Sequence, residues 1–255
     1  NQNKAVYDNQ PFIDNIEVFE LHNILTLTKQ YKKYDLAFDL EPYLKLSALL
    51  TNHLSQKTIG FSHGPRAKLY DQLVHYNDKI HAVNTFSNLL KPLELKPKVL
   101  DKLITLKYSK QDKHRVDKFF NKLPKRRLII GMTVTSAGTA TWRRWSPLKF
   151  AQLADKLIKK HNAIIIIPDT PNQHKYIEQI INQMEEKEAV YNLAGKFSLK
   201  QLFRLTEKCN LYISNDTGPL HIAAAQGTNT IGLFGPNTPV RYAPYGKNNL
   251  SLYKS

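Results

Sequence analysis

The residues best suited to chemistry lie in one turn near the carboxyl end of the chain. A polar turn over residues 214–218 follows the apolar residues 211–213 and precedes a run of small residues over 219–226. This order predicts a buried strand, a turn and a helix. Since free N–H groups and the positive end of the helix dipole bind anions at a helix start, the turn predicts a phosphate site.

Five residues of this turn and helix are candidates for contact with a bound phosphate. Thr217 offers a hydroxyl, Gly218 lets the backbone approach a ligand closely, and Pro219 suits a first helical turn. His221 lies about one helical turn further along and can reach the same pocket. The fifth candidate is Asp216. The alternative interpretation of the whole motif is an ordinary turn with a capping Asp216 and a buried His221.

A second polar turn follows the next predicted strand, over residues 230–234. This strand ends in Gly235-Pro236-Asn237. Ligands of open α/β sheets bind at the carboxyl ends of the strands. We therefore expect both turns to border one site.

Hydroxylic residues followed by paired arginines form a further group, between residues 133 and 145. Thr139 and Thr141 precede Arg143 and Arg144 there. Guanidinium groups bind phosphate oxygens through two hydrogen bonds and stay charged. This pattern makes the arginine pair, Thr139 and Thr141 candidate phosphate ligands, and the alternative is an exposed basic turn before a helix.

These motifs together resemble the carboxy-terminal signature of the heptosyltransferases, GT-B enzymes that transfer a heptose from ADP-heptose to the inner core of lipopolysaccharide. The resemblance rests on Asp216-Thr217-Gly218-Pro219-Leu220-His221, Ala223-Ala224-Ala225 and Leu233-Phe234-Gly235-Pro236. In this family a lysine commonly lies two residues before the tryptophan that is Trp145 here. Arg143 occupies that position, so the resemblance implies that Arg143 neutralises the donor diphosphate.

Predicted strands and helices alternate along the whole chain, as is typical of parallel α/β sheets. We expect an α/β fold of the GT-B class, with two Rossmann-like doubly wound domains facing a cleft. Residues 1–115 would form the acceptor-side domain and 125–255 the nucleotide-sugar domain. Residues 15–19 are predicted to form a strand and 25–34 a helix, while the apolar run 163–167 predicts a strand covered on both faces.

The resemblance also implies a general base on a Gly-Asp loop after the family's first strand. No such loop precedes residues 15–19, so we expect the base to lie before Asn1 and the first domain to be incomplete at its start. The chain would then bind the donor but transfer sugar poorly. Asp39, at the end of a strand predicted over 36–39, is the candidate base within the chain, and a capping or solvated role is the alternative.

The charge balance indicates anionic partners. The chain has 37 Lys and Arg residues against 21 Asp and Glu residues, a formal net charge of +16. The lysines are dispersed and form no nucleic-acid motif, so we expect no nucleic-acid partner. The alternatives are a solvated basic face, or docking on an anionic glycolipid acceptor and the inner-membrane surface.

Two further observations bear on the compartment and the cofactors. Cys209 is the single cysteine, which excludes an intrachain disulfide and fits the cytoplasm. The sequence has neither Asp-x-Asp nor a His/Cys cluster at ligand spacing. We therefore expect no protein-bound metal and no cofactor, with ADP-heptose as substrate, although Mg²⁺ carried by the nucleotide is compatible with this expectation.

The predicted function is that of an inverting glycosyltransferase, cytoplasmic and peripheral to the inner membrane, that moves a heptose from ADP-heptose to the lipopolysaccharide inner core. One alternative is a family member that uses another nucleotide sugar. The other is a non-catalytic module that binds a nucleotide sugar or an anionic glycan.

Overall fold

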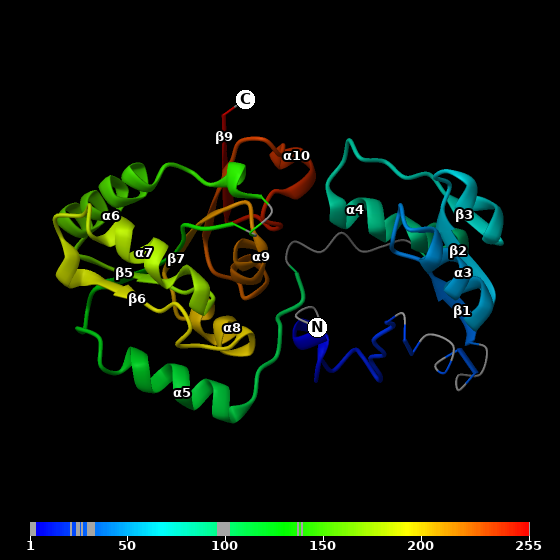
Figure 1. The fold of residues 1–255 in the computed structure, drawn as a ribbon, viewed down its shortest axis with the longest axis horizontal. Coiled ribbons are helices and arrows are strands. Elements are labelled where there is room, and N and C mark those ends of the chain that lie inside the picture. Colours follow the sequence, from blue (N-terminus) through cyan, green and yellow to red (C-terminus); the bar gives the residue numbers. More distant parts are fainter. Residues whose placement is uncertain are drawn as a thin grey trace. The chain divides into compact units, whose positions relative to one another are not determined.

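The computed structural model describes residues 4–20, 22–23, 26, 28–29, 34–95, 103–136, 138 and 140–254. The chain forms two compact units (Figure 1). The larger contains Asn1–Ile16 and Leu100–Ser255, and the smaller is Glu17–Val99. This division differs from the expected domains 1–115 and 125–255, because the first sixteen residues and the residues after 100 belong with the later unit.

Two glutamine side chains attach the chain before α5 (Lys110–Phe120) to the larger unit. The Gln226 amide accepts from Leu106 N at 2.8 Å and donates to Leu106 O at 3.2 Å. Gln10 does the same with Lys107, at 2.9 Å and 3.3 Å. Both glutamines are buried. Each amide satisfies a backbone donor and acceptor of an extended segment, so residues 106 and 107 are fixed to the unit ahead of the expected boundary.

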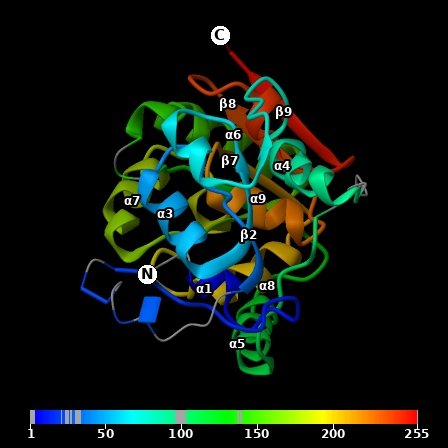
Figure 2. The same cartoon turned by 90° about the vertical axis from the view of Figure 1, so that its right-hand side faces the viewer.

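The larger unit is built on a parallel sheet. Within the described residues its strands lie in the order β6-β5-β4-β7-β8-β9, and all of their pairings are parallel. The strands are β4 (Leu128–Thr133), β5 (Ala163–Ile167), β6 (Val190–Asn192), β7 (Leu211–Asn215), β8 (Thr230–Phe234) and β9 (Asn249–Tyr253). Figure 2 shows β9 beside β8 at one edge.

Helices cover both faces of this sheet. One face packs against α6 (Pro147–His161) and α7 (His174–Ile181), and the other against α5, α8 (Leu199–Glu207) and α9 (Gly218–Ala225) (Figures 1 and 2). The β5 side chains divide between the two cores: Ile165 and Ile167 join the first, while Ile164 and Ile166 join the second. Alternate side chains of a strand point to opposite faces, which explains why the whole run is apolar.

The smaller unit has a parallel sheet in the order β1-β2-β3 among its described residues. Its elements are β1 (Tyr34–Phe38), α3 (Lys45–Leu54), β2 (Ser55–Phe61), β3 (Gln72–Val74) and α4 (Ala82–Ser87). Ile59, Phe61, Val74 and Leu89 form its buried core. This unit also follows the expected alternation of strands and helices.

The strand expected over residues 15–19 is wrong, since the structure shows no regular element there. Asparagine side chains bond backbone groups of this region: the Asn15 side chain accepts from Ile16 N, and Asn23 donates to Val18 O. Such local bonds compete with strand pairing. Most of the helix expected over 25–34 lies outside the described residues, and its last residue, Tyr34, begins β1.

Close packing of β4 against β7 requires a glycine at position 131. A Cβ atom at Gly131 would lie 2.3 Å from Cδ2 of Tyr212. The Tyr212 ring is fully buried, and its hydroxyl lies 2.8 Å from Thr133 Oγ1. Any side chain at position 131 therefore collides with a ring that has no space to move.

We expect Gly131→Ala to lower the free energy of unfolding of the larger unit by about 1–3 kcal/mol, the usual cost of overpacking a core. Urea titration measures this change in the free energy of unfolding. Gly138→Ala is the matched control, because a Cβ at Gly138 meets no atom within 4 Å. That variant should change stability by less than about 1 kcal/mol. Equal losses in the two variants would contradict the steric explanation.

Candidate functional site

The two polar turns and the basic loop lie at the carboxyl ends of three adjacent strands. Arg143 ends a short 3-10 helix after β4, Asp216 follows β7, and Asn237 follows β8. Arg143 Nη1 lies 3.6 Å from Asp216 Oδ2, and Asn237 Nδ2 donates to the same oxygen at 2.6 Å. The two turns and the basic loop therefore border one site, at the sheet edge where ligands of such folds bind.

Asn215, the last residue of β7, holds the basic loop in place. Its Oδ1 accepts from Trp145 N at 2.9 Å, and its Nδ2 donates to Thr135 O at 3.1 Å. The side chain is fully buried. It fixes both ends of the loop that carries Arg143. Sequence reasoning missed this role, because it assigned Asn215 to the polar turn over 214–218, whereas the structure extends β7 to this residue.

The turn before α9 leaves the start of that helix open. The Thr217 hydroxyl lies 3.1 Å from Ser214 Oγ and 3.3 Å from Asn215 O, and it makes no capping bond to the helix amides. A Cβ atom at Gly218 would meet nothing within 4 Å. An uncapped helix start beside open space is suited to an anion.

The two neighbouring arginines differ in their contacts. Arg144 donates to Ser136 Oγ and Ser136 O at 3.2 and 3.3 Å, and its guanidinium lies over the Tyr176 ring at 4.7 Å. The Arg143 guanidinium makes no hydrogen bond to any described residue, and its Nε is buried without a partner. Its side chain is 35% exposed. Arg143 is therefore the arginine with donors available to a ligand.

The remaining predicted residues are placed as follows. Thr141 is exposed at the start of the same 3-10 helix as Arg143, and Pro219 occupies the first turn of α9. His221 is partly buried on α9, about one turn from Gly218. Thr139 lies outside the described residues. Contact of any of these residues with a nucleotide stays a prediction.

Asp39, the candidate base, belongs to a buried ion pair in the smaller unit. Its Oδ2 accepts from Arg66 Nη2 at 2.7 Å and from the Tyr70 hydroxyl at 2.6 Å, while Oδ1 accepts from Glu41 N at 2.9 Å. Burial and the bond to Asp39 raise the pKa of Tyr70 to about 12. Asp39 is only 4% exposed, which excludes a solvated role. The bond to Glu41 N agrees with the capping alternative, and the buried pair favours a structural role over proton abstraction.

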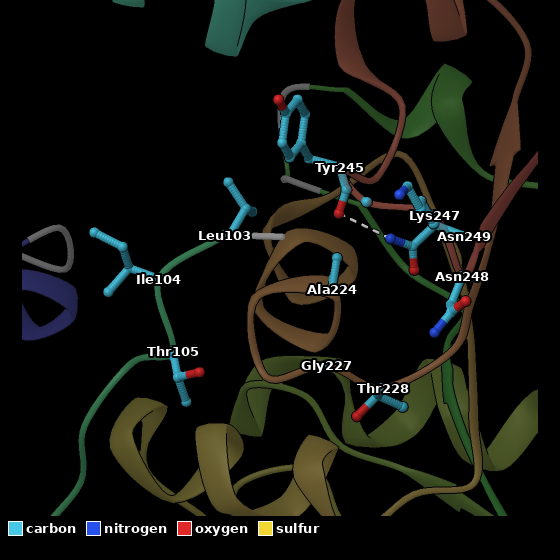
Figure 3. Close-up of a pocket in the computed structure, with 11 residues that line it drawn as sticks. Leu103, Ile104, Thr105, Ala224, Gly227, Thr228, Tyr245, Lys247, Asn248 and Asn249 are labelled. Atoms are coloured by element: carbon cyan, nitrogen blue, oxygen red, sulfur yellow. Dashed lines mark hydrogen bonds between the residues drawn. The ribbon is translucent and has the colours of Figure 1, made fainter. Parts of the chain in front are cut away.

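A separate pocket of about 650 Å³ lies elsewhere in the larger unit (Figure 3). Leu103, Ala224 and Tyr245 supply apolar surface, and Thr228 and Asn248 line it shortly before β8 and β9 begin. The pocket thus lies at the amino-terminal ends of these strands and contains none of the predicted phosphate residues. It is the wrong edge of a parallel sheet for the nucleotide.

The described residues contain neither a metal-binding cluster nor a helix that could span a membrane. They hold no group of three or more His, Cys, Asp or Glu side chains that could bind a metal ion. No helix among them combines the length and the apolar character needed to cross a membrane.

Comparisons with known proteins identify relatives of the chain. The family model described as "Glycosyltransferase family 9 (heptosyltransferase)" matches residues 25–254. The lipopolysaccharide core heptosyltransferase OpsX of Haemophilus influenzae is 28% identical over 243 residues, which cover 91% of this chain and 67% of that protein.

Solved structures show the same fold. A glycosyl transferase family 9 protein from Veillonella parvula matches with a TM-score of 0.84 and 24% identity, over 99% of this chain and 75% of that one. The E. coli heptosyltransferase WaaC, solved with ADP, matches with a TM-score of 0.67 and 21% identity, over 93% of this chain and 73% of that one.

We expect Asp39→Ala to lower the free energy of unfolding of the smaller unit by about 3–5 kcal/mol, because it leaves the buried Arg66 charge without a partner. Chemical denaturation measures this loss. Asp35→Ala is the control: Asp35 is exposed on β1 and accepts only a long bond from Gln56. Its removal should cost less than about 1 kcal/mol. Similar stability of the two variants would show that the buried pair is not structural.

Proposed function

Because the chain belongs to glycosyltransferase family 9, we propose that it transfers a heptose from ADP-heptose to the inner core of lipopolysaccharide, with inversion at the anomeric carbon. The expected family and the α/β GT-B fold class are confirmed by the family match and by the solved relatives. The donor, the acceptor and the stereochemistry are parts of the proposal.

The observation that carries the proposal concerns Arg143 and the start of α9, which both lie close to Asp216. One supplies a partly exposed guanidinium that makes no hydrogen bond to a described residue, and the other supplies helix amides that the Thr217 side chain does not cap. A diphosphate offers enough oxygen atoms for both. The presence of ADP in the E. coli heptosyltransferase structure supports an adenine nucleotide as the molecule that carries this diphosphate.

The proposed reaction breaks the bond between the anomeric carbon of the heptose and an oxygen of the ADP β-phosphate. The bond's electron pair leaves with ADP, so negative charge increases on the phosphate in the transition state. Arg143 and the α9 amides stabilise that charge, and stabilisation of developing charge is usually a large part of catalysis. The acceptor hydroxyl attacks the opposite face and loses its proton to a general base, which we assign to no residue of this chain.

The proposal also concerns the metal requirement, the acceptor and the location of the enzyme. Since Arg143 and the helix start act on the leaving group, the protein needs to supply no metal, and any Mg²⁺ enters with the nucleotide. The net charge of +16 favours an anionic glycolipid acceptor and contact with the inner-membrane surface from the cytoplasm.

Transfer is tested by incubating the natural full-length polypeptide with ADP-heptose and a heptose-deficient lipopolysaccharide core. The expected products are ADP and an acceptor whose mass has increased by one heptose. A panel of other nucleotide sugars identifies a different donor. Binding of ADP without transfer from any donor would replace the proposed enzyme with a binding module.

We expect Arg143→Ala to weaken ADP binding by about 1.5–3 kcal/mol, the usual contribution of a hydrogen bond to a charged group. Titration calorimetry measures the affinity. Arg144→Ala is the matched control, because Arg144 is engaged by Ser136 and Tyr176 and should affect stability more than affinity. Equal losses of affinity, or a loss from Arg144→Ala alone, would refute the assignment.

Gly218→Val should abolish most ADP binding while leaving the fold intact. The new side chain projects into open space at the start of α9, where the phosphates are proposed to lie. Gly218→Ala should cause a smaller loss because its side chain is shorter. Unchanged ADP affinity in a folded Gly218→Val protein, judged by its urea transition, would show that the site is misplaced.

A further inference from the structure

We infer that Asn237 is a positioning residue that keeps Arg143 available to the donor diphosphate by occupying the carboxylate of Asp216. The inference rests on the proposed donor site and adds a residue to it. Asn237 does not contact the diphosphate in this arrangement. It acts through Asp216 on the arginine.

The distances show which group holds the Asp216 carboxylate. Asn237 Nδ2 donates to Oδ2 at 2.6 Å, whereas Arg143 Nη1 lies 3.6 Å from the same oxygen, beyond hydrogen-bond length. The Asp216 side chain is only 9% exposed, so it needs a donor from the protein. Asn237 supplies that donor as a neutral amide, and the arginine keeps its own donors.

Without the Asn237 amide, Arg143 is the nearby group able to replace it. Its guanidinium is partly exposed, makes no hydrogen bond to a described residue, and already lies beside the carboxylate. A short pair between guanidinium and carboxylate is stronger than a neutral hydrogen bond. Such a pair would compete with the diphosphate for the same donors, and the affinity for the ligand would fall.

The fold places Asn237 for this role. Strands β7 and β8 are adjacent and parallel, so the residues that follow them lie side by side. Asn237 itself lies between Pro236 and Thr238, and the Thr238 hydroxyl caps α10 (Pro239–Tyr242) by accepting from Val240 N at 3.3 Å. The proline before Asn237 restricts the backbone that carries the amide.

A double-mutant cycle tests the inference, with ADP affinity measured by calorimetry. Asn237→Ala is made in the unmodified chain, in Arg143→Ala and in Asp216→Asn. We expect it to raise the Kd of ADP about 5- to 10-fold in the unmodified chain, the ratio that corresponds to one hydrogen bond. In the other two backgrounds we expect no further change, because either the arginine or the carboxylate charge that traps it is absent.

Matched variants separate positioning from a general structural role. Thr238→Ala removes the neighbouring helix cap and leaves the Asp216 contact, so the Kd of ADP should stay unchanged. Asn237→Leu keeps the volume without the donor and should behave like Asn237→Ala. An equal loss in all three backgrounds, an unchanged Kd in the unmodified chain, or failure of both Asn237 variants to fold would overturn the inference.

Pyrophosphate as a second probe distinguishes this inference from the proposed donor. If the chain binds ADP and Asn237→Ala has no effect, the positioning role fails and the proposed function stands. If the chain binds pyrophosphate but not ADP, the cycle is measured with pyrophosphate. The expected result would then support the positioning role and show that the proposed nucleotide is wrong. Binding of neither probe overturns both.

Discussion

Parallel pairing of β4, β7 and β8 is the constraint on which the candidate site depends. Parallel strands end at the same edge, so the loops that follow these three strands meet there although Arg143, Asp216 and Asn237 are far apart in sequence. The pairing requires Gly131, because the Tyr212 ring occupies the space of its missing side chain. The core that holds the sheet together thus also sets the distances in the site.

The two units use an aspartate and an arginine in opposite ways. Asp39 and Arg66 are both buried and 2.7 Å apart, with Tyr70 bonded to the same carboxylate oxygen. Separating such a pair leaves a charge without solvent or partner, so it is fixed. Asp216 and Arg143 lie 3.6 Å apart, and the arginine is partly exposed. The proposed donor site needs an arginine of this kind, whose donors are not held by a close carboxylate.

Local patterns predicted the elements that carry the site. The expected strands over 163–167 and 230–234 coincide with β5 and β8, and the helix expected after the turn at 214–218 is α9. These succeed because the period of apolar residues and the turn chemistry act over a few residues. The strand expected over 15–19 failed because a strand also needs a partner, and the side chains of Asn15 and Asn23 bond the backbone there instead.

The sequence by itself determined the family, the alternation of strands and helices, and the turn suited to phosphate, since each depends on neighbouring residues. Only the tertiary structure decided the tasks of individual side chains. Arg143 and Arg144 are adjacent residues of the same type, yet only Arg144 bonds Ser136 and lies over the Tyr176 ring. The sequence places Asp39 at a polar strand end, and only the structure shows that it forms an ion pair with Arg66, 27 residues further along the chain. The partner of a side chain is set by which distant elements pack beside it, and no local pattern records that.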